Sequence, residues 1–413
     1  MAEPIVKSTI QWPTVSLGEI CSTGGGDIQT GPFGSQLHAA DYVPVGVPSV
    51  MPQNIGDNKI VEEGIARITP EDAKRLSRYL LRPEDIVYSR RGDVTRRALV
   101  SPQQSGWLCG TGCLRVRVGA AANAKFISYY LGHPEVREWI MRHAVGATMP
   151  NLNTTILSSL PVTIPPAADQ ASIADLLGAL DEKIAVNDRI AATARALGTT
   201  KFVEAAQLSD AVDVRLSDMC VALTRGVAPK YTDDPDELIV INQKCVRGGR
   251  VSLEPARKTL AEKVREPKLL HRDDVLVNST GVGTLGRVAR WTFAERATVD
   301  SHVTIVRFNP ERIDPVCGGF AMLAAQAEIE ALGEGSTGQT ELSRAQLGGL
   351  KIRVPSREVA IALRPQLDAL EAKSDAVLAE SHVLAELRDA LLPPLMSGEI
   401  RVRDAEKVVE GAV

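Results

Sequence analysis

The feature that most constrains the fold of this chain is an internal duplication. Its clearest part aligns GATMPNLNTTILSSLPVTIPP (146–166) with GSTGQTELSRAQLGGLKIRVPS (335–356), so that Pro165 and Pro355 lie 190 positions apart. Thr148 and Thr337 lie 189 apart, and one inserted residue accounts for the difference. A repeat at a fixed offset indicates that one structural unit occurs twice. We therefore expect a monomer with internal pseudo-two-fold symmetry.

Two shorter segments repeat in the same order. VSLGEIC (15–21) has its counterpart in VRLSDMC (214–220), and RPEDIVYSRRG (82–92) has its counterpart in HRDDVLVNSTG (271–281). In the second of these pairs, two acidic residues lead into a short apolar run that ends in a turn. This pattern predicts a buried strand at the same place in each copy.

A long helical stretch follows each copy. The first covers roughly 169–205 and has an apolar seam with spacings of four and three at Ile173, Leu177, Leu180 and Ile184, continuing through Asn187, Ala191 and Ala194. The second follows a strict seven-residue register at Leu363, Leu370, Val377, Leu384 and Leu391, with mixed positions at Leu367, Ser374 and Ser381. Such seams predict either a mutual antiparallel coiled coil or two amphipathic helices on separate cores. Small seam residues and the polar Asn187, which could fix the register, favour the coiled coil.

Composition bounds the class of protein. A chain of 413 residues that is 44% hydrophobic and 24% charged is a soluble protein of two to four domains. No apolar run is long enough to cross a membrane, and the start lacks the pattern of a secretory signal. Six scattered cysteines indicate reduced thiols in the cytoplasm, and the close pair Cys109 and Cys113 lacks the second pair that a zinc site needs. We expect an α+β fold with two globular parts and two long helices.

Sequence motifs of catalysis are missing. GVGTLG (281–286) matches a dinucleotide fingerprint, but RVARWTFAERATV follows it and looks like strand and loop rather than a helix that opens at a phosphate. A glycine-rich turn between two strands is the better interpretation. The sequence also lacks a P-loop, the H-E-x-x-H and G-x-S-x-G patterns, and the Asn-Pro-Pro-aromatic motif of adenine methyltransferases. We predict no catalytic site in this chain.

Several motifs together resemble the specificity (S) subunits of type I restriction-modification systems. TGPFGSQLHAADYVPVGVPSVMPQNI (30–55) resembles the opening motif of that family, and SSLPVTIPPAADQASIADLLGALDEKIAVNDRI (158–190) resembles its central region. NSTGVGTLGRVA (278–289) and LRDALLPPLMSGEIRV (387–402) also fit, and the motifs occur in the family's order over nearly the whole chain. PSREVA (355–360) departs from the family pattern, and Pro365 raises the question of how straight the second helix begins.

The resemblance implies two pseudo-symmetric target recognition domains separated by two long antiparallel coiled-coil helices. The expected boundaries are 1–160 for the first recognition domain, 161–206 for the central helical region, 207–355 for the second recognition domain, 356–402 for the C-terminal helical region and 403–413 for a flexible tail. Each domain would read one half of a gapped, bipartite double-stranded DNA target, and the helices would set the spacer between the halves. The chain itself would bind no cofactor. Two methyltransferase subunits would supply S-adenosylmethionine and adenine N6 methylation, and motor-nuclease subunits would use ATP and Mg²⁺.

Side chains that can reach base edges are chiefly Arg, Lys, Asn and Gln, whereas phosphate contacts position the protein. On this basis the candidate DNA-binding residues of the first domain are Ser35, Gln36, Gln53, Asn54, Arg90, Arg91, Arg96, Arg97, Thr148, Asn151 and Asn153. Those of the second are Gln243, Lys244, Arg247, Arg250, Asn278, Ser279, Arg287, Thr337 and Gln339. For the basic segment RRGDVTRR (90–97), a solvated loop is the alternative interpretation.

The segment TGPFGSQL (30–37) is expected to form a tight turn, with Phe33 anchored in the core and Gln36 either reaching a base or holding the loop. The formal net charge of −4 argues for weak DNA affinity of the chain alone. Two other hypotheses remain: a duplicated protein-protein scaffold, and a methyltransferase with an unrecognised active site.

Overall fold

The computed structural model describes residues 4–7, 9–146, 150–208, 210–333 and 341–412. The chain divides into two compact units, one made of residues 1–185 and 381–413 and the other of residues 186–380. Each unit therefore contains one mixed α+β part and one segment of each long helix. None of the described helices is long and apolar enough to cross a membrane.

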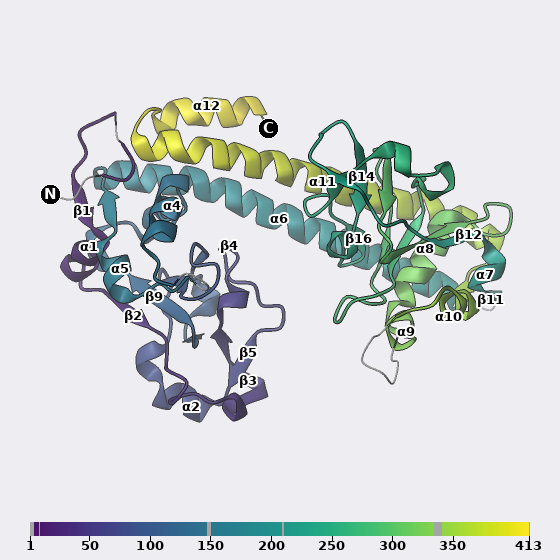
Figure 1. Cartoon of the computed structure of the whole chain (residues 1–413), viewed down its shortest axis with the longest axis horizontal. Helices are drawn as coiled ribbons and strands as arrows, with labels where there is room; N and C mark the ends of the chain where they lie inside the picture. Colours follow the sequence, from purple (N-terminus) through teal and green to yellow (C-terminus); the bar gives the residue numbers. More distant parts are fainter. Residues whose placement is uncertain (1–3, 8, 147–149, 209, 334–340, 413) are drawn as a thin grey trace. The chain divides into compact units, whose positions relative to one another are not determined.

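The first unit contains a larger and a smaller sheet besides a two-stranded ladder (Figure 1). In its described part, the larger sheet has the strand order β2-β9-β6-β7-β4, and the smaller has the order β5-β3-β8. Neighbouring strands are antiparallel except for β4 with β7 and β3 with β8. The strands are β2 (Asp27–Thr30), β3 (Tyr42–Val50), β4 (Asp57–Asn58), β5 (Ala66–Ile68), β6 (Ile86–Ser89), β7 (Arg97–Leu99), β8 (Leu108–Cys109) and β9 (Cys113–Arg117). Helices α1 (Leu17–Thr23), α2 (Pro70–Arg75), α3 (Ala124–Tyr130), α4 (Pro134–His143) and α5 (Thr154–Ser159) complete the unit's globular part.

The second unit repeats this topology with one added edge strand in each sheet, β15 and β13. Its larger sheet has the order β12-β21-β18-β19-β16-β15 and its smaller sheet the order β13-β17-β14-β20, again with parallel pairs at the matching places. The strands are β12 (Cys220–Arg225), β13 (Tyr231–Thr232), β14 (Leu238–Ile241), β15 (Val246–Arg247), β16 (Arg250–Val251), β17 (Arg257–Thr259), β18 (Val275–Asn278), β19 (Val288–Arg290), β20 (Ala297–Val299) and β21 (Val303–Phe308). The helices are α7 (Leu216–Met219), α8 (Pro315–Ala324), α9 (Gln326–Ala331) and α10 (Arg344–Gly349). The duplication expected from the sequence is confirmed.

A two-stranded ladder closes each globular part next to its long helix. β1 (Thr14–Ser16) pairs with β10 (Pro161–Thr163), and β11 (Val212–Arg215) pairs with β22 (Lys351–Val354). The next backbone hydrogen bond is also repeated, because Leu17 N donates to Leu160 O at 2.9 Å and Leu216 N donates to Leu350 O at 2.9 Å. Each domain is thus entered and left at adjacent strands.

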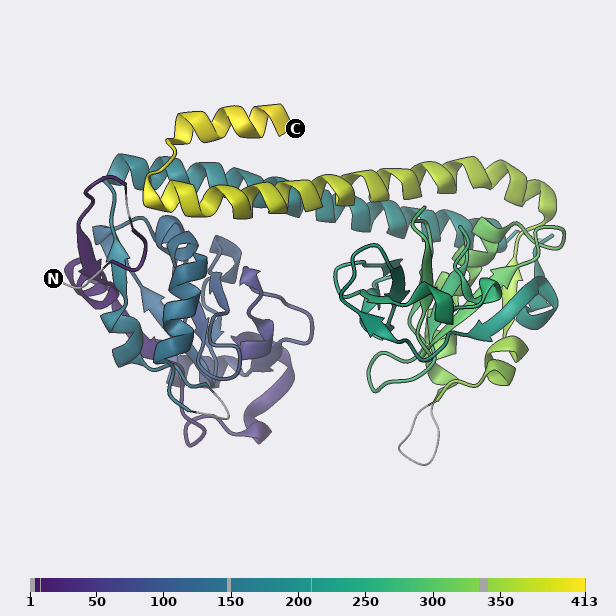
Figure 2. The same ribbon diagram turned by 45° about the horizontal axis from the view of Figure 1, so that its top comes forward.

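The two long helices are uninterrupted. α6 runs from Ala167 to Ala206 and α11 from Arg357 to Ser397, so Pro365 does not end the helix (Figures 1 and 2). In the first unit the N-terminal segment of α6 packs against the C-terminal segment of α11, as Arg388 pairs with Asp181 there. In the second unit the opposite segments pack, as Lys201 bonds to Gln366. The helices are therefore antiparallel in both units, which confirms the expected fold class.

The seam between these helices is more polar than the strict heptad pattern predicted. Leu367, Ser374 and Ser381 are buried, whereas Leu370 is only half-buried. Asn187 is 1% exposed and donates from Nδ2 to Glu380 Oε2 at 2.9 Å. A buried amide with one specific partner favours a single register of the helix pair.

Different contacts tie the two helices to their domains. Gln170, the glutamine of the family-like PPAADQ segment, is 3% exposed, donates to Pro165 O at 2.8 Å and accepts from Asn123 N at 2.9 Å. At the start of α11, where the sequence departs from that pattern, Arg364 instead pairs with Asp314 at 2.6 Å. Asp314 caps α8, as Asn123 caps α3. An ion pair therefore joins α11 to the cap of α8, as Gln170 joins α6 to the cap of α3.

The C-terminal segment is ordered, which corrects one expectation. Residues 403–413 were expected to be a flexible tail, but α12 (Val402–Ala412) covers the described residues 403–412. Ala405 is fully buried against the core of the first unit, where Val402 and Val409 also pack. The amphipathic pattern of valines and charged residues in this segment is the signal for such a helix.

Candidate nucleic-acid interface

In the first unit, backbone hydrogen bonds gather four loops at one edge of the sheets. Gly31 N donates to Cys113 O, Arg90 N to Gly112 O, and Gly110 N to Val50 O, at 2.8–2.9 Å. Leu152 N donates to Arg90 O at 2.9 Å, which brings in the segment before α5. We call residues 31–38, 51–54, 90–96, 110–112 and 150–153 the first loop cluster.

The second unit builds the same frame. Gly226 N donates to Val303 O, Ser279 N to His302 O, and Asp300 N to Ile241 O, at 2.8–3.1 Å. Leu342 N donates to Ser279 O at 2.8 Å. The described residues among 226–230, 242–245, 279–287, 300–302 and 341–342 form the second loop cluster. Isolated bridges pair Arg91 with Asn151 in the first cluster and Thr280 with Glu341 in the second.

Both clusters depend on a glycine that directly follows a strand, Gly31 after β2 and Gly226 after β12. A Cβ at Gly31 would lie 2.1 Å from Gly110 O, and a Cβ at Gly226 would lie 1.9 Å from Val299 O. Any side chain there would push two loops apart. This explains why TGPFGSQL and TRGVAPK (224–230) share a glycine at the same place, although they share little else.

The structure resolves the roles within TGPFGSQL. Phe33 is 54% exposed, so the expectation that it anchors the turn in the core is wrong; Leu37, at 3% exposed, is the anchor. Gln36 Oε1 accepts hydrogen bonds from Phe33 N at 3.2 Å and from the Tyr79 hydroxyl at 2.8 Å. The Gln36 side chain therefore holds the loop, while Ser35 and Phe33 face outward.

The arginines of 90–97 separate into two groups. Arg91 and Arg96 are exposed in the first loop cluster, and Arg90 lies with its guanidinium 6.0 Å from the centre of the Phe33 ring. Burial opposes the ionisation of Asp93, but hydrogen bonds from Thr95 and Arg96 lower the pKa of this carboxyl and so favour its ionised form.

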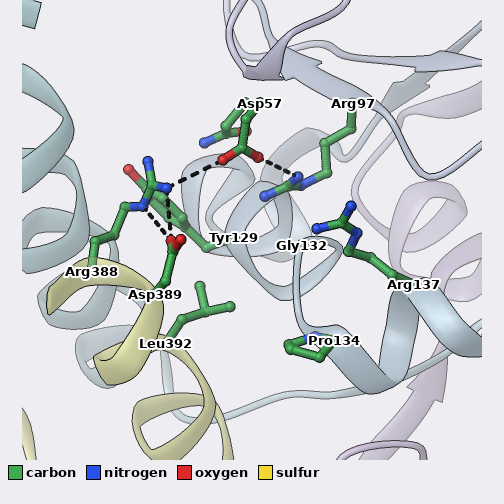
Figure 3. Close-up of a pocket in the computed structure, with 10 residues that line it drawn as sticks. Asp57, Arg97, Tyr129, Gly132, Pro134, Arg137, Arg388, Asp389 and Leu392 are labelled. Atoms are coloured by element: carbon green, nitrogen blue, oxygen red, sulfur yellow. Dashed lines mark hydrogen bonds and ion pairs between the residues drawn. The ribbon is translucent and has the colours of Figure 1, made fainter. Parts of the chain in front are cut away.

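Arg97, in contrast, is 6% exposed and points away from the cluster. It donates to Ser128 O at 2.6 Å. It also donates to Asp57 Oδ1 at 3.2 Å, as Figure 3 shows. The prediction that it binds DNA is therefore wrong.

The predicted amide residues of the first domain also divide by burial. Gln53 is exposed in the loop cluster, but Asn54 is 1% exposed and bonds to Met51 N and Val61 O. Asn153 caps α5 through Ile156 N at 2.8 Å. Asn151 is half-buried, and among the described residues its buried Oδ1 has no hydrogen-bond partner. Asn54 and Asn153 are thus frame residues, whereas Gln53 and Asn151 remain candidates.

In the second domain, Lys244 and Arg247 are exposed, and Arg250 and Arg287 are half-buried. Gln243 donates to Thr280 O at 2.9 Å and so holds its loop, as Gln36 does in the first domain.

Two predicted residues of the second domain lie in the core. Asn278 and Ser279 are fully buried, with Asn278 Nδ2 bonded to Gln243 O at 3.1 Å and Ser279 Oγ 2.5 Å from Thr304 Oγ1. They therefore do not present their side chains to a ligand. Thr148, Thr337 and Gln339 lie outside the described residues.

Sequence reasoning missed several groups in the second loop cluster or next to it. Arg225 pairs with Glu341 and donates to Leu342 O at 2.7 Å, and Thr280 Oγ1 lies 2.9 Å from His302 Nδ1. The aligned repeat contained the signal for Thr280, because it pairs this residue with Arg91. Burial raises the pKa of the Asp300 carboxyl, which accepts a hydrogen bond from His302 N in the same loop.

The glycine-rich segment 281–286 is a turn between β18 and β19, as expected. Gly281, Gly283 and Gly286 have φ values of 100°, 74° and 80°, which favour glycine. Val282 at its tip is 91% exposed. Among the described residues, no group of His, Cys, Asp and Glu side chains could hold a metal ion. Cys109 and Cys113 are buried in a hydrophobic cluster.

Comparison with known proteins gives a consistent result. Residues 10–194 match the family model described as type I restriction modification DNA specificity domain. A comparison with curated protein sequences finds no match.

Among solved structures, the chain is similar to the S subunit of a type I restriction-modification system from M. genitalium, with 17% identity, a TM-score of 0.54, and coverage of 95% of this chain and 99% of that chain. It also aligns with a chain from a structural study of assembly and conformational transition of the type I R-M system, at 16% identity, TM-score 0.43 and coverage of 95% and 100%. The HsdS subunit from Thermoanaerobacter tengcongensis aligns at 17% identity, TM-score 0.37 and coverage of 95% and 98%. Residues 10–194 thus match the DNA specificity domain family of type I restriction-modification systems, and the chain shares the fold of the M. genitalium S subunit.

Proposed function

We propose that this chain is the non-catalytic DNA-recognition subunit of a type I restriction-modification complex, in which each loop cluster binds one half of a gapped, bipartite double-stranded target. The observation that carries the proposal is the repeated backbone frame with different side chains on it. The first cluster displays Arg91, Arg96 and Gln53, and the second displays Lys244 together with the half-buried Arg287. One frame with two sets of polar side chains suits two half-sites of different sequence.

The partners follow from the family. Two methyltransferase subunits would dock on the helical regions and carry out adenine N6 methylation with S-adenosylmethionine. Motor-nuclease subunits would use ATP and Mg²⁺. The chain would contribute target choice, and the antiparallel helices would set the distance between the half-sites.

Methylome mapping tests the proposal. N6-methyladenine is mapped in cells with and without the gene, and a gapped motif with two defined halves should disappear on deletion. An unchanged methylome would contradict DNA recognition and leave the protein-protein scaffold. Methyl transfer by the purified chain alone would show that it is an enzyme.

Variants locate the interface. Arg91→Ala with Arg96→Ala should weaken binding of the assembled complex to its target about tenfold at moderate salt, and should flatten the salt dependence of binding, because each lost phosphate contact releases about one counterion fewer. Arg142→Ala is the matched control, since Arg142 is exposed on α4 and pairs with Glu138 outside the loop cluster. Equal losses for both variants would place the DNA elsewhere.

The spacer is tested by deleting one heptad from both helices, residues 184–190 and 378–384, which removes Asn187 together with its partner Glu380. The methylated motif should keep both half-sites and have a shorter spacer. Altered half-sites would contradict the role of the helices as a ruler.

A further inference from the structure

The two long helices exchange specific polar contacts along their seam. In the first unit Arg388 Nη1 donates to Asp181 Oδ1 at 2.6 Å. In the second unit the contacts are Asn187 with Glu380 at 2.9 Å, Arg195 with Ser374 at 3.2 Å, and Lys201 with Gln366 at 2.9 Å. In each contact one group comes from α6 and its partner from α11.

Arg388 is built into its place. Figure 3 shows its guanidinium between Asp57 and Asp389, and the distances to these carboxylates are 3.2 and 2.7 Å. The Arg388 side chain is 15% exposed, and its partner Asp181 also accepts from the Tyr129 hydroxyl at 2.5 Å. Burial opposes the charge of this arginine, but Asp181 and Asp389 outweigh it and raise the pKa of Arg388 further.

Consider a pair in which a second α6 takes the place of α11. The internal repeat identifies the α6 residue that would then lie at the position of each α11 residue. The offset of 190 that relates Pro165 to Pro355 continues along the seam without a gap. It takes the α6 seam positions 173, 177, 180, 184, 187, 191, 194 and 198, all buried except the half-buried 184, onto the α11 positions 363, 367, 370, 374, 377, 381, 384 and 388. A symmetric pair of two α6 helices can therefore be compared with the native pair residue by residue.

In such a pair, every polar partner supplied by α11 is lost. The positions of Gln366, Ser374, Glu380 and Arg388 are taken by Leu176, Ile184, Ile190 and Gly198. None of these four replacements carries a polar side-chain atom. Asn187 would face Ile190 in place of a carboxylate, and Asp181 would face Gly198 in place of a guanidinium.

The loss is serious for Asn187 because this amide is 1% exposed and its Oδ1 already has no hydrogen-bond partner among the described residues. Without Glu380, the whole buried amide would be unsatisfied. Burying an unpaired polar group is far less favourable than burying a bonded one.

Gly198 shows that the native pair also uses this asymmetry for packing. A Cβ at this position would lie 3.0 Å from the Phe320 ring, which stacks on Phe202 with ring centres 6.3 Å apart. The second unit therefore needs the small residue where the first unit needs Arg388. A pair of two α11 helices would keep one contact, since Arg388 would then meet Glu371, the counterpart of Asp181.

We propose that the seam of α6 (Ala167–Ala206) is a partner-selective surface that accepts α11 and rejects a second copy of itself. Asn187, Asp181, Arg195 and Lys201 carry the choice, because each has a bonded partner on α11 and an aliphatic or glycine residue at the same place on α6. The inference concerns pairing within the chain and does not depend on DNA recognition.

The test uses the full chain with a protease site inserted between Gln207 and Leu208, next to the end of α6. Two preparations with N-terminal tags of different mass are cleaved and mixed, and native mass spectrometry counts the pairs that form. Wild-type fragments should give N-terminal with C-terminal pairs, and pairs of two N-terminal fragments should stay at least about tenfold below the statistical share. Pairs of N-terminal fragments at that share would overturn the proposal.

A switch variant makes the result decisive even if wild-type pairs exchange slowly. Ile190→Glu with Gly198→Arg gives α6 the two partner groups of α11, so a second α6 can bond both Asn187 and Asp181, and the arginine also disturbs Phe320 in the native pair. Cleaved chains of this variant should form pairs of N-terminal fragments. The matched control is Val186→Glu with Leu197→Arg, which adds the same charges at exposed positions 39% and 43% accessible. Equal behaviour of switch and control would show that these groups do not select the partner.

Discussion

Arg117 clamps the buried carboxylate of Asp85 with two hydrogen bonds, from Nε to Oδ1 at 2.7 Å and from Nη2 to Oδ2 at 2.6 Å. Arg307 and Asp274 repeat this clamp in the second unit at 2.8 and 2.6 Å. Both carboxylates are 1% exposed and lie in the acidic pairs that the sequence places before the strands β6 and β18. The clamp joins the turn before one central strand to its neighbour in the sheet.

Because the carboxylate is buried, removing its charge should be costly. Asp85→Asn should lower the free energy of unfolding of the first unit by about 3–5 kcal/mol, since it leaves a largely buried guanidinium without its counter-charge. Unfolding in urea, monitored by hydrogen exchange, measures the loss of stability in each unit separately. Asp93→Asn is the control, because Asp93 pairs with Arg96 at half-exposed positions and should change stability by at most about 1 kcal/mol. An equal loss in both variants would mean that burial of the pair has no influence.

Gln36 should act through the shape of its loop. Gln36→Ala should weaken target binding without changing the bases that are read, because the side chain bonds to Phe33 N and the Tyr79 hydroxyl. Tyr79→Phe removes only the hydrogen bond from the Tyr79 hydroxyl to Gln36. Tyr79 is 2% exposed, and its substitution should have a similar but smaller effect on target binding. Methylome mapping reads the recognised motif for both variants. A changed half-site in Gln36→Ala and an unchanged one in Tyr79→Phe would show that Gln36 contacts a base.

Leu37, and not Phe33 as the sequence suggested, anchors the TGPFGSQL turn in the core. Phe33→Ala should change stability by no more than about 0.5 kcal/mol, since the ring is 54% exposed. It should reduce target binding, because an exposed apolar ring beside Arg90 can contact a thymine methyl or a base step. Leu37→Ala should cost about 2–5 kcal/mol of stability. Thermal unfolding together with binding at fixed salt separates the two effects, and a stability loss in Phe33→Ala would contradict the exposed position.

Asp300 should make the second unit less stable as the pH rises. Burial raises the pKa of this carboxyl in the folded state, so between its unfolded and folded pKa values the native state binds more protons than the unfolded state. The contribution of Asp300 to stability is therefore complete below its unfolded pKa and is lost as the pH rises through its folded pKa. Asp300→Asn should remove this part of the pH dependence and be at least as stable as wild type at neutral pH. Unfolding in urea at pH 4 and pH 7, monitored by fluorescence of the buried Trp291, measures the pH dependence of stability in the wild type and in Asp300→Asn. An identical pH dependence in both proteins would refute the prediction.

The repeat made much of the fold predictable. The alignment of RPEDIVYSRRG with HRDDVLVNSTG placed β6 and β18 correctly, and the seam spacings located both long helices to within a few residues. These features are encoded locally, in periodicity and in residues that end strands. Asn187 was also correctly identified as the polar residue of the seam, since an amide among apolar residues at helical spacing can be read from sequence alone.

The site was harder to predict because residue type does not report burial. Arg97, Asn54 and Asn278 have the right chemistry for base contacts, but tertiary hydrogen bonds use their side chains inside the fold. Phe33 was misplaced for the same reason: an aromatic residue in a loop is usually buried, but here Leu37 fills the core instead. Only the packed structure decides between two neighbouring apolar residues.

The strand pairs β1 with β10 and β11 with β22 have a consequence for how new specificities can arise. Because the chain enters and leaves each recognition domain at adjacent strands, everything between Leu17 and Leu160 forms an insertion with a single narrow neck. An exchange of that whole insertion for another of the same kind would need to match this three-residue ladder and the contacts with the long helices, such as Asn123 with Gln170 and Asp57 with Arg388. The helices and the second domain would keep their own covalent neighbours. Under the proposed function, one half-site could therefore change while the other stays the same.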